Sequence, residues 1–300
     1  MNKHMNGIIN IYKEAGFTSF DVVAKMRGIL KIKKIGHTGT LDPDATGVLP
    51  VCVGNGTKLV ELFADHDKEY IAELMLGVAT DTQDLSGTVL KESTVEVTHE
   101  QIEEIVKEFV GDCMQIPPMY SALKVNGQKL CDLARAGKEV EREPRKVTFH
   151  EIEILSIELP IVKLRVKCSK GTYIRTLCND IGEKLGCYGA MKSLLRTKVG
   201  MFGLEEAITL AELEQYRDEG KLAEVVLSPD RVFMHLPAVY ALPEFCRLLD
   251  NGNTVYPKML ENPPYFKDGM EVRMYGEEKF YGIFRYVAED HRLKPVKMFL

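Results

Sequence analysis

Asp42 is the residue whose type and surroundings most clearly suggest chemistry. It lies in residues 36–50, GHTGTLDPDATGVLP, where three glycines and two prolines exclude a regular helix. No alternation in this stretch predicts a half-buried strand, and Leu41 and Val48 are too apolar for a solvated linker. Pro43 restricts Asp42 to extended backbone geometry. A loop of this kind is typical of a carboxylate that the fold holds in one place.

The residues alone leave three interpretations of Asp42 open. It could cap a turn, which is the common role of an Asp-Pro pair. It could belong to a phosphate-binding loop, although no Gly-Lys-Ser/Thr follows it. It could be the nucleophile of a phosphotransferase, since residues 42–46 read D-x-D-x-T. That reaction favours an apolar strand before the aspartate and a Mg²⁺ site, and residues 36–40 do not read as such a strand.

The other reactive residue types form no motif. The seven cysteines contain no C-x-x-C pair, and the seven histidines contain no H-x-H or H-x-x-x-H pair. We therefore expect no disulfide framework, no metal site and a reducing, cytoplasmic environment. No run of eighteen apolar residues or apolar leader segment is present, so we expect neither a membrane span nor a secretion signal.

Charge is distributed unevenly along the chain. The net charge is −5, yet residues 22–37 carry five Lys/Arg and no acid. Residues 163–199 carry nine Lys/Arg against two acids, whereas residues 92–112 hold seven acids against one lysine. Such segregation could give an acidic protein one positive face that binds nucleic acid, or it could give solvated faces that never meet.

Periodicity and capping signals indicate the elements that surround Asp42. Strands are expected over residues 7–12, 68–76 and 162–168, the last with a basic face. Helices are expected after a Ser19 cap, over residues 58–63, after the capping boxes of Thr98 and Thr209, and from Tyr173. Residues 112–145 are irregular and read as a functional insertion that orders on binding. Beyond about residue 236, short strands between turns predict a small β module.

Residues 36–50 also resemble a known motif. The bacterial tRNA pseudouridine-55 synthases of the TruB family carry G-H-T-G-x-L-D-P-x-A-T-G-V-L-P, and every fixed position is present here. Further blocks follow in the family's order over residues 7–200. They are Lys68-Glu69-Tyr70, Asp81-Thr82-x-Asp84, residues 115–124, residues 168–176 and Leu194-Leu195-Arg196.

The resemblance implies both a reaction and an architecture. The family isomerises a uridine in the T-loop of tRNA by breaking its N1–C1′ bond, turning the base and rejoining it through C5, without cofactor or metal. The implied fold is α+β, with a mainly antiparallel mixed sheet flanked by helices and a small C-terminal β-barrel-like PUA module. We expect a catalytic domain over 1–235, with 112–145 as its RNA-binding insertion, and a PUA-like RNA-binding domain over 236–300.

The resemblance also assigns catalytic roles. Asp42 is the nucleophile, with attack on C6 or on C1′ left open, and Arg175 pairs with it. Tyr70 stacks on the extruded uracil, although a strand tyrosine taken alone is more often a core residue.

RNA-binding roles follow in the same way. Tyr173 lies beside the target base, Leu195 floors the pocket, and His37 fills the space that the base leaves, although a histidine in a turn commonly has only a structural role. Lys124 and Lys170 bind RNA. One departure from the family is Cys131, where an aromatic residue is usual, and it affects the expected RNA contacts of the insertion rather than the chemistry.

The partner expected from the resemblance is the T-arm of tRNA, bound by a monomer. The alternative from another functional class is a non-catalytic RNA-binding protein with the same basic surface. A carboxylate paired with an arginine favours the enzyme, because a binder of phosphates gains nothing from an acid among its cations.

Overall fold

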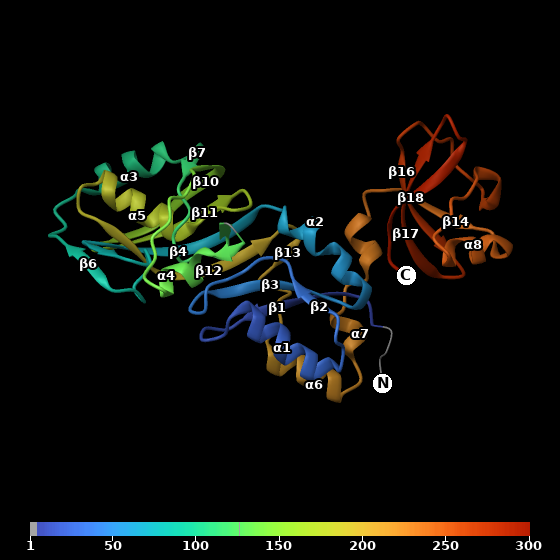
Figure 1. Ribbon diagram of the computed structural model, residues 1–300, viewed down its shortest axis with the longest axis horizontal. Coiled ribbons are helices and arrows are strands. Elements are labelled where there is room, and N and C mark those ends of the chain that lie inside the picture. Colours follow the sequence, from blue (N-terminus) through green and yellow to red (C-terminus); the bar gives the residue numbers. More distant parts are fainter. Residues whose placement is uncertain (1–4, 126) are drawn as a thin grey trace.

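The computed structural model describes residues 5–125 and 127–300. It contains a large mixed sheet flanked by helices, followed along the chain by a smaller β module (Figure 1). The main sheet has the strand order β1-β3-β12-β4-β11-β10-β7, with β2 and β13 attached to β3 and β12. All its pairs are antiparallel except β3 with β12. Its strands are β1 Gly7–Lys13, β2 Ile35–His37, β3 Thr46–Val53, β4 Lys68–Leu76, β7 Gly111–Gln115, β10 Arg145–Glu158, β11 Ile161–Cys168, β12 Gly189–Val199 and β13 Phe202–Gly203. The expected α+β, mainly antiparallel mixed sheet is confirmed.

Helices cover this sheet in two groups. The larger helices are α1 Ser19–Leu30, α3 His99–Glu108, α5 Ile174–Lys184 and α6 Leu210–Asp218. The shorter helical pieces are η1 Gly54–Leu59, α2 Val60–Ala64, α4 Leu130–Arg135, α7 Leu222–Val225 and η2 Pro229–Phe233. Apolar side chains of α3 and α5 pack in one core with β4, β10 and β11, whereas those of α1 and α6 pack in another with β1 and β3. The expected strands over 7–12, 68–76 and 162–168 and the helices at Thr98, Tyr173 and Thr209 are confirmed.

Two helix starts differ from expectation. Thr18, not Ser19, caps α1, because Thr18 and Asp21 form a reciprocal capping box. Ser19 is already helical, and its hydroxyl accepts from Leu41 N at 2.9 Å, which ties α1 to the Asp42 loop. The helix expected over residues 58–63 is 3₁₀ up to Leu59 and α-helical only from Val60.

Residues 36–50 are less irregular than their composition suggests. Their ends lie in β2 and β3, and β3 does not alternate because nearly every residue in it is buried. Gly47 has φ +105°, and a Cβ there would lie 2.2 Å from the Arg196 carbonyl oxygen. Glycine at this position therefore permits the parallel pairing of β3 with β12.

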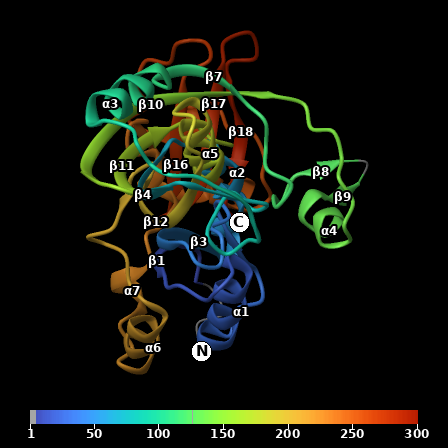
Figure 2. The same cartoon turned by 90° about the vertical axis from the view of Figure 1, so that its left-hand side faces the viewer.

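The predicted insertion, residues 112–145, begins inside β7 and ends at the first residue of β10. Between them lie the hairpin of β8 Lys124–Val125 with β9 Gln128–Lys129, and α4. These elements project from the body of the sheet (Figure 2). A second small hairpin joins β5 Val78–Thr80 to β6 Val89–Glu92.

The basic face expected on β11 lies beside acidic residues of the neighbouring strands. Lys163 and Lys167 lie opposite Glu73 and Glu69 of β4, and Arg165 forms an ion pair with Glu153 of β10. The alternation was predicted correctly. Arg165 has an acidic partner, whereas Lys163 and Lys167 form no ion pair in the described residues and only face acids across the sheet.

The C-terminal β module has a core of its own. Its strands β14 Ala238–Ala241, β15 Leu260–Glu261, β16 Glu271–Gly276, β17 Lys279–Val287 and β18 Arg292–Met298 form a sheet in the order β15-β14-β16-β17-β18, with α8 Cys246–Asp250 beside it. The expected closed barrel is not found: in the described residues the edge strands do not pair, and only the bridge Val255–Leu293 links the two sides. The two-residue β15 is too short to complete a barrel wall. No helix among the residues described is long and apolar enough to cross a membrane.

Candidate active site

Asp42 lies in the wall of a cavity of about 340 Å³. The cavity is bounded by the loop before Asp42, by β4 and β12, by the turn before α5 and by residues 120–123 of the insertion. It opens beside a larger cleft, also lined by Asp42, that reaches Cys131 and Arg135 of α4 and the β5–β6 hairpin.

The cavity brings Asp42 and Arg175 together from positions 133 residues apart. Arg175 Nε lies 3.0 Å from Asp42 Oδ2, and Nη2 donates to Asp42 Oδ1 at 3.4 Å. Both atoms of one guanidinium edge therefore face both carboxylate oxygens, in the arrangement that orients a carboxylate most firmly. The Arg175 side chain is 6% exposed, whereas 38% of the Asp42 side chain stays open toward the cavity and cleft.

Three further groups fix Arg175. Nη1 donates to Thr82 O at 3.0 Å and lies 3.6 Å from Asp84 Oδ2, and Nη2 donates to Tyr120 O at 2.7 Å. The sequence block around Asp84 thus anchors the arginine, and the insertion touches it directly through Tyr120.

Burial raises the pKa of Asp42 above its ordinary value. The Arg175 guanidinium opposes this shift, whereas the neighbouring Asp84 carboxylate adds to it. The ionised form of Asp42 therefore depends on Arg175.

Lys13 supports the other side of the Asp42 loop. Its side chain is fully buried at the end of β1, and Nζ donates to Pro43 O at 2.8 Å and to Glu14 O at 2.9 Å. Burial lowers the pKa of Lys13 to about 8. The ammonium thus holds the turn that follows Asp42.

Tyr70 is at once a core residue and part of the cavity wall. It belongs to the core cluster of β4, β11 and α5, and its ring also lines the cavity. Burial raises the pKa of Tyr70 to about 12, which keeps the phenol neutral. Arg196 lies opposite Tyr70 in the sheet and donates to Val48 O at 2.7 Å and Gly39 O at 3.2 Å, so it fastens the loop before Asp42 to β12.

Tyr173 lines the cavity at the N-cap of α5, two residues before Arg175. No side chain of its own caps the helix; instead Gln115, 4% exposed, accepts from Tyr173 N at 2.8 Å and donates to Tyr173 O at 3.0 Å. The end of β7 is thus clamped to the start of α5.

The position expected for Leu195 is wrong, because Leu194 lines the cavity instead. Leu194 and Arg196 lie opposite Ala72 and Tyr70, which are buried on the cavity side, whereas Leu195 lies opposite half-buried Ile71. Side chains alternate along a strand, so Leu195 points to the other face.

The other three RNA-binding candidates lie outside the cavity wall. His37 is half-buried in β2; burial and the Arg196 charge lower its pKa, and its Nδ1 has no hydrogen-bond partner in the described residues. Lys170 is exposed in the turn beside the cavity and pairs with Asp65 at 2.7 Å. Lys124 is exposed on β8, out in the insertion.

Sequence reasoning assigned no role to Lys13, Gln115 and Arg196. A signal existed for two of them: Lys13 ends an apolar strand, and Arg196 falls on the same face of β12 as Leu194. Gln115 gave none, because its partner is the backbone of a residue 58 positions away. Among residues 5–125 and 127–300, no group of three or more His, Cys, Asp or Glu could hold a metal ion.

Several known proteins are similar to this chain. A protein of Lachnoclostridium phytofermentans named tRNA pseudouridine synthase B is 52% identical over 99% of this chain and 100% of its own length. One of Alkaliphilus oremlandii with the same name is 45% identical over 98% of this chain and 97% of its own. Among solved structures, a chain of a Cbf5-Nop10-Gar1 complex matches with a TM-score of 0.71 and 27% identity over 98% of this chain and 85% of that one.

Two family models together match residues 27–234, which include both Asp42 and Arg175. Residues 27–174 match the N-terminal domain of TruB family pseudouridylate synthases, and residues 175–234 match the tRNA pseudouridylate synthase B C-terminal domain. Asp42 falls within the first of these matches and Arg175 opens the second. The resemblance read from residues 36–50 is thereby confirmed, and the chain belongs to the TruB family of pseudouridylate synthases.

Proposed function

We propose that this isomerase is a tRNA pseudouridine-55 synthase in which Asp42 is the nucleophile. The observation that carries the proposal is the Asp42–Arg175 pair at the wall of a cavity of about 340 Å³, which is room enough for one nucleobase. A uridine inside a stacked loop must be extruded to reach this carboxylate, which costs on the order of a few kcal/mol.

Each wall of the cavity supplies one part of the reaction. Arg175 keeps Asp42 ionised and oriented for attack on C6 or C1′. Tyr70 stacks on the extruded base, Tyr173 lies beside it, and Leu194 takes the floor position. The glycosidic bond breaks, the base turns, and the new bond forms through C5 as the C5 proton leaves. The chain therefore needs neither redox cofactor nor metal for this isomerisation.

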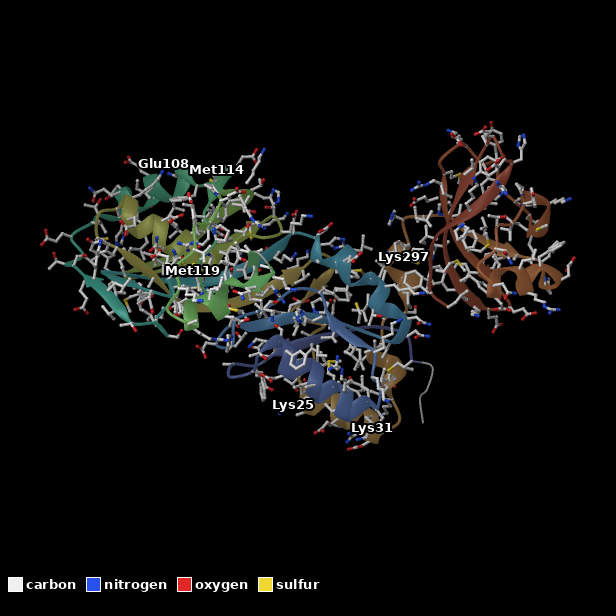
Figure 3. All side chains as sticks on the ribbon, viewed as in Figure 1. Lys25, Lys31, Glu108, Met114, Met119 and Lys297 are labelled. Carbon is white, nitrogen blue, oxygen red and sulfur yellow. The ribbon has the colours of Figure 1, made fainter. Side chains whose placement is uncertain are left out.

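The RNA backbone would be held by cations that have no acidic partner. Residues 25–34 of α1 and its C-terminal turn contribute five Lys/Arg, and none of them forms an ion pair among the described residues. Lys25 and Lys31 lie along the lower edge of the molecule, on the opposite side from acidic α3 with Glu108 (Figure 3). Lys124, which likewise forms no ion pair in the described part of the chain, extends this role to the insertion. Lys170 would reach the RNA at the cavity mouth by exchanging its partner Asp65 for a phosphate, and His37 would contact the RNA as a neutral side chain beside Arg196.

The C-terminal module would bind tRNA beyond the T-arm. Lys297 of β18 donates to Lys58 O at 2.9 Å, so cations of both parts meet where the module joins the sheet (Figure 3). The seven free cysteines suit a reducing cytoplasm, in which we expect the chain to work as a monomer.

Tritium release tests the reaction directly. A T-arm transcript carrying C5-tritiated uridine should lose tritium in the presence of the chain, and EDTA should not prevent the loss. Asp42→Asn should bind the transcript yet release no tritium, because a carboxamide keeps the shape but not the nucleophile. Asp44→Asn is the matched control, and we expect it to stay within about threefold of wild type.

The outcomes separate the competing functions. Binding without any release by the wild-type chain would favour the non-catalytic RNA-binding protein. A release that EDTA abolishes would indicate metal-dependent chemistry, which the proposed isomerisation does not need. Release by Asp42→Asn at near wild-type rate would remove Asp42 from the mechanism.

A further inference from the structure

Two hydroxyl groups in the cavity wall have no hydrogen-bond partner. Thr38 is 1% exposed and Ser121 is 5% exposed, and both residues line the cavity. Thr38 Oγ1 and Ser121 Oγ are two of six buried side-chain polar atoms left without a partner among the described residues. An unpaired buried hydroxyl destabilises a fold, so its presence at a binding cavity needs a reason.

Other polar side chains in the same cavity wall do have hydrogen-bond partners within the protein. Lys68 Nζ donates to Ala64 O and His66 O, both at 2.6 Å. Ser169 Oγ accepts from Thr148 N, and Thr172 Oγ1 donates to Ser169 O, both at 2.9 Å. These groups, like Arg175 and Arg196, already have protein partners. Burial raises the pKa of the Tyr173 phenol and the nearby Ser121 hydroxyl opposes this rise, yet Ser121 Oγ forms no hydrogen bond of good geometry with the phenol.

The chemistry of uracil explains why hydroxyls suit these positions. The base presents two acceptors, O2 and O4, on either side of the N3–H donor, and losing water leaves all three unsatisfied. Turning the ring to exchange N1 with C5 also exchanges O2 with O4, and the product gains an N1–H donor. A hydroxyl can donate or accept, so one group can serve the base before and after the turn.

We propose that Thr38 and Ser121 hydrogen-bond the polar edge of the extruded uracil and hold it in both orientations. This inference rests on the proposed function. The two hydroxyls come from different segments of the cavity wall, Thr38 from the loop before Asp42 and Ser121 from the insertion. The base would thus be held between the catalytic loop and the RNA-binding segment.

Hydroxyl-deleting variants test the proposal without changing side-chain shape. Thr38→Val and Ser121→Ala should each lower single-turnover kcat/KM on a T-arm RNA by about 3- to 10-fold, the effect of one lost hydrogen bond. Their unfolding midpoints should equal or exceed that of wild type, because no internal hydrogen bond is lost. Thr197→Val is the control: its hydroxyl donates to Glu69 at 2.7 Å, outside the cavity wall, and we expect unchanged catalysis.

Thio-substituted RNA identifies the contact on the base. With 2-thiouridine or 4-thiouridine at the target position, wild type should slow several-fold, because sulfur is a poor acceptor. The variant that lacks the corresponding hydroxyl should show a smaller sulfur effect. The proposal is overturned if both variants match wild type, if their losses follow a lowered unfolding midpoint, or if the sulfur effects are the same in wild type and variants. Absence of activity in wild type itself would instead contradict the proposed function.

Discussion

Arg175 is the residue on which the site depends most. Its guanidinium contacts the carboxylates of Asp42 and Asp84 and the carbonyls of Thr82 and Tyr120. These partners come from three separate stretches of the chain, so one side chain holds together the Asp42 loop, the β5–β6 hairpin and the insertion.

Replacing Arg175 should shift the pH dependence of the reaction. In the proposed mechanism the rate requires ionised Asp42 and therefore rises with pH through the pKa of that carboxyl, which burial already raises. Arg175→Met removes the charge that opposes the shift, so the acid limb should move to higher pH. At neutral pH the rate should fall at least about 100-fold, since breaking a buried pair from one side costs roughly 3–5 kcal/mol.

Single-turnover pseudouridine formation across pH measures this effect, and Arg175→Lys is the companion variant. Lysine keeps the charge without the two-pronged geometry, so it should restore the position of the acid limb better than the maximal rate. An Arg175→Met rate equal to wild type at neutral pH would mean that Arg175 only binds phosphate.

Tyr70 permits a separation of its two roles. Tyr70→Phe should keep most activity, because the ring is retained and the phenol is neutral. Tyr70→Leu keeps apolar bulk in the core but loses the stacking face, worth roughly 1–3 kcal/mol, and should lower the rate about tenfold or more. Rates and unfolding midpoints measured together decide the matter, and a Leu variant that is unstable yet fully active when folded would leave Tyr70 a core residue only.

The sequence singled out Asp42 as the candidate nucleophile but did not predict the groups that surround it. Asp42 was conspicuous because its loop is locally unusual, whereas its pairing with Arg175 came only from the family resemblance. Lys13 and Gln115 bind backbone carbonyl and amide groups, which every residue possesses, so no sequence pattern marks their partners.

At the scale of elements, the predictions depended on which residues of each strand face the core. Alternation correctly predicted β4 and β11, whose faces differ in polarity. It failed for β3, which is buried on both faces, and it left the phase of β12 open, so that Leu195 was chosen in place of Leu194. Register between strands depends on contacts that are distant in sequence.

The clamp between β7 and α5 gives a prediction at this scale. Gln115→Met removes both hydrogen bonds to Tyr173, together worth about 1–3 kcal/mol. The start of α5 should loosen and carry Arg175 with it, so kcat should fall about 3- to 30-fold while KM for RNA changes little. Single-turnover and steady-state kinetics measure the two separately.

Met114→Ala is the matched control for the clamp, since Met114 is 65% exposed on the same strand and points away (Figure 3). It should behave as wild type. If Gln115→Met lowers only the unfolding midpoint and leaves kcat intact, Gln115 supports the fold without positioning the site.

At the scale of the molecule, the sequence predicted short strands beyond residue 236, which are found, and a closed barrel, which is not. Turn signals marked its boundaries, while closure of a barrel depends on strand lengths and register that turns do not reveal. Its junction with the sheet includes an aromatic cluster beside the lysines: the rings of Phe299 and Phe233 lie 6.1 Å apart, and Phe280 stacks on Phe299 at 5.5 Å.

A chain ending at Pro237 should fold and modify an isolated T-arm at a rate close to that of the whole chain, because every cavity residue precedes position 200. Its affinity for full-length tRNA should fall about tenfold, or roughly 1.4 kcal/mol. Titrations at one fixed salt concentration measure this loss. Full-length Phe299→Ala loses junction packing alone, and if it weakens tRNA binding as much as truncation does, the module positions the sheet and does not bind RNA.

The strand order also determines when the parts of the main sheet can pair during synthesis on the ribosome. The first 64 residues, which carry the nucleophile, join the rest of the sheet only where β3 meets β12, so that seam stays open until residues 189–199 have been made. At about 5–20 residues per second, the delay from β3 to β12 is roughly seven to thirty seconds. A ribosome that stops before residue 175 releases a chain with Asp42 but without Arg175. We expect such prematurely terminated copies not to modify RNA.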